Sequence, residues 1–158
     1  MSRRKIGVAA ALVAAAMMTG APAMALTVGP DCKTANTYFQ TSTDSGQTNS
    51  ASFTQVPNGF FAINTKKTGC IIVNFVADTY IYPSDTIVVE AVLDSNVMDP
   101  GPLAFDDGDN NIGASHVATW AASNVAPGIH NLFIYWKVQG GSTTASMGYS
   151  TTTFTYSK

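Results

Sequence analysis

Apolar side chains recur at every second residue along each long segment of this chain, and no segment keeps the period of an amphipathic helix. In the segment 86–94, one parity is entirely apolar and consists of Ile87, Val89, Ala91 and Leu93. Because successive side chains of a β-strand point to opposite faces, this alternation is typical of a strand with a buried face. The sequence therefore predicts an all-β protein.

Eight segments carry this pattern, and turn-forming residues rich in Pro, Gly and Asn separate them. We expect strands at residues 37–41, 50–56, 60–64, 70–77, 86–94, 115–122, 130–138 and 144–156. Short strands at this spacing are typical of an antiparallel β-sandwich, so we expect about eight strands in a single domain spanning residues 26–158. Residues 94–113 form the one long stretch without a pattern. Long irregular loops are usually functional or mobile, so this stretch is the first place where we expect a functional site.

The first 25 residues have the features of a cleaved signal peptide. Basic residues at positions 3–5 precede an apolar run over residues 6–18, and Ala23-Met24-Ala25 provides the small residues that signal peptidase reads. A membrane anchor is the alternative, but the apolar run is shorter than the ~20 residues that span a bilayer. We therefore expect a secreted or periplasmic protein that is processed after Ala25.

Both cysteines of the chain, Cys32 and Cys70, follow the signal peptide. Paired cysteines in an exported protein are usually oxidised, so we expect a disulfide bond between them. The alternatives are a pair of buried free thiols and a metal site, but no CxxC motif or similar ligand cluster accompanies the cysteines to hold a metal.

The positions of the tryptophans argue against an immunoglobulin framework. That framework places a tryptophan between its two cysteines and a tyrosine two residues before the second one. Here Thr68 stands two residues before Cys70, and both Trp120 and Trp136 follow it. Eight strands with long connections fit a jelly roll better, so the predicted fold class is an all-β, antiparallel, jelly-roll-like β-sandwich.

Several stretches of the sequence suggest a family. They are Phe60-Phe61-Ala62-Ile63, Cys70-Ile71-Ile72-Val73-Asn74-Phe75, the alternating residues of 88–94, and the run 127–136 with its Pro-Gly-x-His opening. In strand spacing the chain resembles small exported bacterial proteins of unknown function that have the jelly-roll layout of tumour necrosis factor and complement C1q. The resemblance covers most of the chain after the signal peptide and carries no catalytic residues. It implies a trimer with aromatic side chains along its axis.

Charge excludes one class of partner. After the signal peptide, five basic side chains stand against ten acidic ones, a formal net charge of −5. The basic residues are scattered except for Lys66-Lys67, whereas nucleic-acid binding needs a basic stripe. We therefore expect no nucleic acid as a partner, and no membrane span in the mature protein.

A calcium site is one hypothesis for the long loop. Oxygen donors stand at alternate positions, as at the start of a calcium loop, on Asp107, Asp109 and Asn111. Ile112 stands where such a loop requires glycine, and Ala118 stands where it requires a bidentate glutamate. A solvated acidic turn is therefore the competing interpretation.

Catalysis is the weakest of the functional hypotheses. Ser115-His116 and His130 are candidate triad members, but the chain has no G-x-S-x-G motif, and the alternation places His130 beside apolar residues. The single glutamate, Glu90, fits a cross-strand or surface role better than glycoside cleavage. We therefore expect no catalytic residues.

Aromatic residues are more numerous than one small core face needs. If the odd positions of segment 130–138 face outward, Phe133 and Tyr135 form an apolar patch that a monomer would rarely expose. Such a patch suits a subunit interface of a homo-oligomer or a stacking platform for sugar rings. We therefore predict a non-catalytic protein-binding or self-assembling module at or outside the cell envelope. A carbohydrate-binding module, with or without calcium, is the alternative, and a hydrolase is the third hypothesis.

Overall fold

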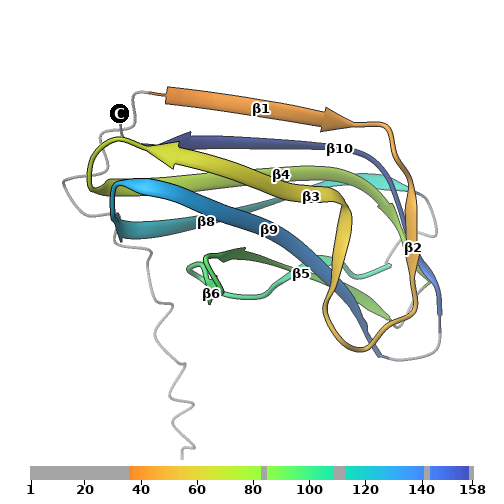
Figure 1. Cartoon of the computed structure of the whole chain (residues 1–158). Coiled ribbons are helices and arrows are strands. Elements are labelled where there is room, and N and C mark those ends of the chain that lie inside the picture. Colours follow the sequence, from red (N-terminus) through yellow and green to blue (C-terminus); the bar gives the residue numbers. More distant parts are fainter. Residues whose placement is uncertain (1–35, 83–84, 109–112, 141–142, 157–158) are drawn as a thin grey trace, which may run out of the picture.

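Ten β-strands form two antiparallel sheets that enclose one core (Figure 1). The computed structural model describes residues 36–82, 85–108, 113–140 and 143–156, and these residues contain no helix. The first sheet, called here the β4 sheet, has the order β1 (Asn36–Ser42), β10 (Ala145–Tyr156), β4 (Gly69–Tyr80) and β8 (Ala114–Val125), with β2 (Gly46–Thr48) paired to β10. The second, called the β9 sheet, has the order β3 (Thr54–Thr65), β9 (Gly128–Gln139), β5 (Thr86–Leu93) and β6 (Asn96–Val97), with β7 (Leu103–Asp106) paired to β5.

The chain changes sheets at almost every connection. After β1 and β2 in the β4 sheet it crosses to β3, returns as β4 and crosses again to β5. Strands β6 and β7 stay beside β5, and the chain then alternates between the sheets through β8, β9 and β10. This alternation is the connectivity of a jelly roll. The predicted antiparallel, jelly-roll-like sandwich is therefore confirmed.

The number of strands is higher than expected because of the short strands β2, β6 and β7, although a bulge in β3 joins two of the expected strands into one. The expected strands at 50–56 and 60–64 contribute to a single strand, whose pairing with β9 shifts register between Gln55 and Phe60. A Cβ added at Gly59 would lie only 2.4 Å from its nearest neighbour, so the backbone passes close to other atoms there. The Pro-Asn-Gly signal of a turn therefore produces a bulge within a strand.

Residues 94–113 are not uniformly irregular, contrary to expectation. They contain β6 and β7, which both pair with β5. Asp94 and Ser95 have φ angles of 48° and 69° and form the two-residue turn between β5 and β6. Such a hairpin turn needs positive φ at both residues, which a pair such as Asn-Gly usually provides. Because this turn contains neither residue, the sequence pattern did not reveal it.

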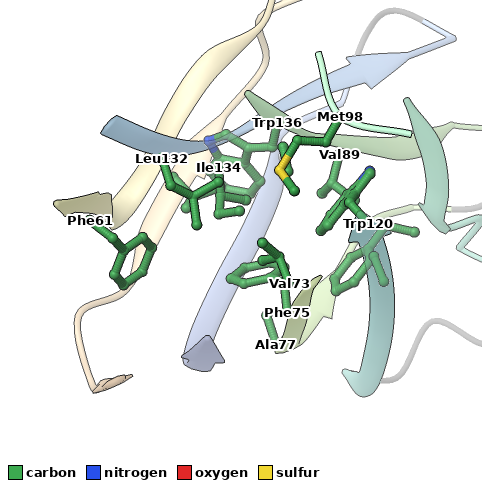
Figure 2. Packing of buried hydrophobic residues seen from close by; sticks show 14 of the residues in the cluster. Phe61, Val73, Phe75, Ala77, Val89, Met98, Trp120, Leu132, Ile134 and Trp136 are labelled. Carbon is green, nitrogen blue, oxygen red and sulfur yellow. The ribbon is translucent and has the colours of Figure 1, made fainter. Parts of the chain in front are cut away.

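The core consists of the side chains that the strands of both sheets direct toward each other. Figure 2 shows side chains from β4, β8 and β9 meeting there, together with Met98 from the segment between β6 and β7. The largest fully buried side chains are Trp120, Trp136, Phe75, Ile63, Ile71, Ile81, Ile87, Leu132, Ile134, Met147, Val56 and Val73. Removing this apolar surface from water holds the two sheets together. The side chains of the other parity of each strand therefore point away from the core.

Some of the sequence predictions fall outside the residues that the structure describes. The signal peptide over residues 1–25 and Cys32 both lie there. Cys70 is the second residue of β4. Its side chain is buried, and it is not a free cysteine. The Cys32–Cys70 disulfide and the export of the protein stay predictions. In the described part of the chain, no helix has the length and apolar character needed to cross a membrane.

Candidate functional site

The odd-numbered side chains of β9 point away from the core. Phe133 and Tyr135 are half-buried and alternate along the strand with the fully buried Leu132, Ile134 and Trp136. Since neighbouring residues of a strand face opposite sides, the two rings lie on the outer face of the β9 sheet. This is the orientation on which the predicted interface or ligand platform depended.

Phe60, Phe133 and Tyr135 form a row of rings that we call the aromatic ribbon. Phe60 is the cross-strand partner of Phe133 and is 46% exposed, and the centres of these two rings are 5.0 Å apart. The rings of Phe133 and Tyr135 are 5.8 Å apart, with an angle of 24° between their planes. Alternation within β9 predicted two members of the ribbon. It did not place Phe60 there, because the pairing of β3 with β9 is not visible in a local pattern.

Two opposite charges lie beside the aromatic ribbon. Glu90 of β5 is the cross-strand partner of Tyr135, and Lys137 follows two residues further along β9. Burial raises the pKa of Glu90, and the positive charge of Lys137 opposes this rise. The Lys137 ammonium also lies 4.6 Å from the centre of the Phe53 ring, within range of a cation–π interaction. The outer face of the β9 sheet thus combines rings with both signs of charge.

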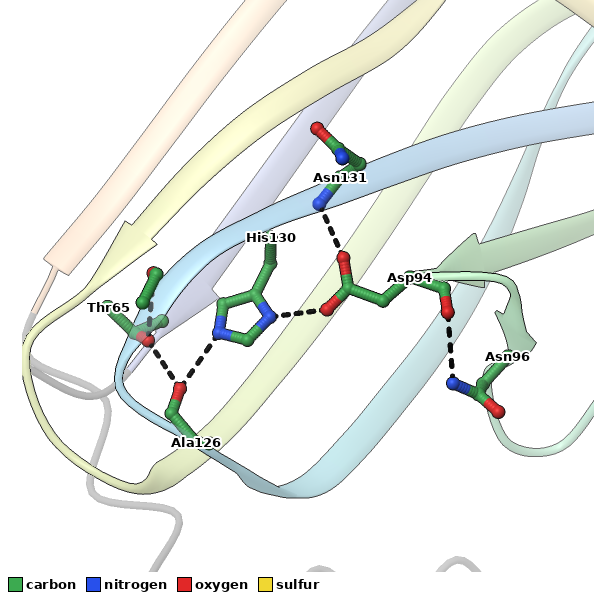
Figure 3. Close-up of polar contacts among 7 residues, drawn as sticks. Thr65, Asp94, Asn96, Ala126, His130 and Asn131 are labelled. Atoms are coloured by element: carbon green, nitrogen blue, oxygen red, sulfur yellow. Dashed lines mark hydrogen bonds and ion pairs between the residues drawn. The ribbon is translucent and has the colours of Figure 1, made fainter.

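His130 connects two turns at one end of the sandwich (Figure 3). Its Nδ1 lies 2.5 Å from Asp94 Oδ2, and its Nε2 lies 2.8 Å from the carbonyl oxygen of Ala126. Both partners accept hydrogen bonds, so with Asp94 ionised only the doubly protonated ring can donate to both. Asp94 Oδ1 also accepts a hydrogen bond of 2.8 Å from the backbone N–H of Asn131. The result is a charged pair that joins the β5–β6 turn to the start of β9.

The surroundings shift the pKa of both members of this pair. Burial alone would raise the pKa of Asp94 and lower the pKa of His130, because it disfavours both charged forms. The hydrogen bonds to both groups and their mutual attraction outweigh burial, so the pKa of Asp94 is lowered and the pKa of His130 is raised. Because both ring nitrogens already donate to protein acceptors, His130 is poorly placed to act as a general base.

An open cavity of about 440 Å³ lies beside the charged pair. Its walls include the apolar side chains Leu93, Val97, Met98, Ala121 and Val125. The polar atoms that Asp94 and His130 present to it are engaged with each other and with the backbone. Its lining also includes Asn96, Asp99 and Ser123, so the cavity offers a ligand both apolar surfaces and polar groups.

Ser115 and His116 do not form a triad, because neighbouring strand residues point to opposite faces. The Ser115 hydroxyl donates a hydrogen bond to the carboxylate of Asp78, on the outer side of the β4 sheet. His116 instead lies 3.7 Å from Asp106, measured between Nε2 and Oδ2. That buried carboxylate accepts a 2.7 Å hydrogen bond from the Thr79 hydroxyl. No nucleophile and base are brought together here.

The predicted calcium ligands lie only partly within the described structure. Asp107 follows β7, whereas Asp109 and Asn111 fall outside the described residues. Among the residues that are described, no group of three or more His, Cys, Asp or Glu side chains could hold a metal ion. The calcium site stays a prediction.

The sequence matches no protein-family model and no curated protein. The fold and the outward rings therefore define only a broad class, a jelly-roll sandwich with an aromatic outer face.

Proposed function

We propose that this protein is an exported, non-catalytic assembly module that binds a second copy of itself through the outer face of the β9 sheet. The aromatic ribbon carries the proposal. Its rings lie on a sheet whose inner face is already filled by the core, so they are not needed to join the two sheets. Aromatic side chains are enriched at protein interfaces and dominate their binding energy.

Charges of both signs lie beside the ribbon, with Glu90 only 8% exposed and Lys137 of the same chain within electrostatic range of it. By strand geometry, Glu90 lies about 5 Å from Tyr135 across the sheet and Lys137 lies about 7 Å from it along β9. We place a two-fold axis in the plane of the interface, through Tyr135, so that it bisects the directions from Tyr135 to Glu90 and from Tyr135 to Lys137. Rotation about this axis brings the Glu90 of each copy toward the Lys137 of the other. The same axis runs across β9 toward Phe60, so rings of the two copies meet along it.

Replacing Phe60 and Tyr135 together with serine is expected to separate the copies. Size-exclusion chromatography with light scattering should give twice the chain mass for the processed protein at tens of micromolar. The double variant should give the mass of one chain, because the ring contacts are lost. Far-ultraviolet circular dichroism should be unchanged, since both side chains point outward. Phe39→Ser is the matched control, because it removes an exposed ring from the other sheet. A monomeric wild-type protein would contradict the proposal.

Exchanging the two charges tests the two-fold arrangement. Lys137→Glu alone should raise the dissociation constant by roughly tenfold, because it places two carboxylates in opposition. Adding Glu90→Lys to it should restore most of the affinity, measured by sedimentation equilibrium. If the double exchange associates no better than the single one, the axis is wrong. A trimeric mass would favour the arrangement implied by the family resemblance instead.

A further inference from the structure

The outer face of the β4 sheet carries hydroxyl groups where the β9 sheet carries rings and charges. We call it the threonine face. Its outward side chains are Thr37, Phe39 and Thr41 on β1, Thr151, Thr153 and Thr155 on β10, Ile72, Asn74, Val76 and Asp78 on β4, and Ser115, Val117 and Thr119 on β8. Among these side chains Asp78 is the single charged one. The face therefore mixes hydroxyl and amide groups with exposed apolar side chains, such as Val76 and Val117, and is almost uncharged.

The pairing of the strands arranges these side chains in rows. One row across the sheet consists of Phe39, Thr153, Asn74 and Thr119, and the next consists of Thr41, Thr151, Val76 and Val117. Side chains that are cross-strand partners share a face, so each row lies on one surface. Neighbouring strands are about 5 Å apart, and rows are about 7 Å apart along the strands. Threonine therefore repeats along β10, at residues 151, 153 and 155, while the groups beside it change from row to row.

Hydrogen bonds within the threonine face hold its polar groups in place. The Thr119 hydroxyl donates to Asn74 Oδ1 at 2.8 Å. The Ser115 hydroxyl donates to the Asp78 carboxylate in the same way. A ligand that reaches β4 and β8 therefore meets polar side chains that are already oriented, which lowers the entropy cost of binding there.

Two exposed rings flank the threonines of β10. Phe39 stands beside Thr153 on the edge strand, and Tyr149 projects from the irregularity between Met147 and Ser150, where the pairing of β10 with β4 shifts register. Each ring is 68% exposed. Neither ring is needed to complete the core.

We propose that the threonine face binds a neutral, linear polysaccharide. The apolar faces of sugar rings stack on exposed aromatic rings, and their hydroxyls exchange hydrogen bonds with hydroxyl, amide and carboxylate groups. A repeating array along β10 suits a chain of repeating sugar units. The described part of this face carries no Lys or Arg to pair with acidic sugars, and the acidic mature chain repels polyanions.

This site is distinct from the proposed dimer interface. The two lie on opposite outer faces of the sandwich, so a dimer formed through the β9 sheet leaves both threonine faces free. Two faces on one particle would strengthen attachment to an insoluble polymer by raising the local concentration of sites.

Co-sedimentation with insoluble cellulose and chitin, and affinity electrophoresis in soluble xylan, test the proposal. The processed protein should bind at least one of these polymers and should not bind alginate, which is anionic. Phe39→Ser and Tyr149→Ser should each weaken binding by roughly tenfold, because each removes a stacking ring. Thr151→Lys with Thr153→Lys should also abolish binding while keeping both rings, because long charged side chains cover the array. The matched control is Ile129→Ser on the other sheet, which removes an exposed apolar side chain outside the aromatic ribbon and should keep most of the binding.

Each outcome of these experiments decides the proposal. Circular dichroism first confirms that the variants are folded, as expected for exposed positions. No binding of the wild-type protein to cellulose, chitin or xylan would overturn it, and so would equal binding by wild type and the Phe39 and Tyr149 variants. A change of oligomeric state in the Phe39 variant would assign this face to a second copy instead. Light scattering of the wild-type protein reports on the dimer separately, so the two proposals can fail independently.

Discussion

Replacing Trp120 with alanine is expected to lower the free energy of unfolding by about 4 kcal/mol, because it opens a large cavity in the centre of the core. Trp120 is fully buried on β8. Its indole Nε1–H also donates a 2.8 Å hydrogen bond to the carbonyl oxygen of Gly101, in the segment between β6 and β7. The side chain therefore links the segment that the sequence marked as irregular to the β4 sheet. Typical domains have only 5–15 kcal/mol of stability, so the loss is a large share of the total.

Urea denaturation of the processed protein, followed by circular dichroism, measures this effect. Trp120→Phe keeps a ring in the core but leaves the Gly101 carbonyl without its donor, so a smaller loss of roughly 1–2 kcal/mol is expected. Val117→Ala is the matched control on the same strand, because Val117 is 67% exposed and its loss should change stability by less than about 0.5 kcal/mol. A loss below about 1 kcal/mol for Trp120→Ala would mean that the two sheets do not pack around this side chain.

Local alternation predicted the features of the fold that depend on single strands. The parity of β9 indicated that Phe133 and Tyr135 face away from Leu132 and Ile134, because side-chain direction follows from the backbone of one strand. Pairing between strands is not local. The alignment of Phe60 with Phe133 depends on a register shift in β3, and no residue pattern encodes the length of that shift.

The threonine face was missed for the same reason. Residues 151–155 form a run of polar and apolar residues that predicts a strand, but the threonines of this run become an array only when β1 and β4 align beside them. The strands β6 and β7 were missed because they contain two and four residues, too few to show a period. Short elements depend on tertiary pairing more than on their own sequence.

The partner of His130 could not be predicted either. Its apolar neighbours indicated a packed residue, and the structure gives it a charged partner 36 residues away. Asp94 reaches it because the chain reverses at Asp94-Ser95, at a turn whose sequence is unusual. A long-range ion pair at the end of a sandwich thus depends on a turn that the local sequence did not signal.

The charged pair between Asp94 and His130 is expected to make the stability of the protein highest in mildly acidic solution. A pKa of Asp94 that is lowered in the folded state contributes stability above the unfolded value of about 4, and this is lost as pH falls through the folded pKa. A pKa of His130 that is raised contributes stability below the unfolded value of about 6.5, and this is lost as pH rises through the folded pKa. Both contributions are therefore present together between about pH 4 and pH 6.5.

Asp94→Asn isolates this effect, because asparagine keeps an acceptor for the Asn131 N–H but removes the charge. The side chain of Asp94 is 41% exposed, so solvent weakens the pair. We expect a loss of about 1–2 kcal/mol at pH 5.5 that shrinks as pH rises through the raised pKa of His130, where one ring nitrogen gives up its proton. Urea denaturation across pH measures the difference between variant and wild type. His116→Gln, which removes the other histidine of the chain, is the control and should leave the pH dependence of this difference unchanged. Parallel stability curves for wild type and Asp94→Asn from pH 5 to pH 9 would show that His130 is not charged in the folded protein.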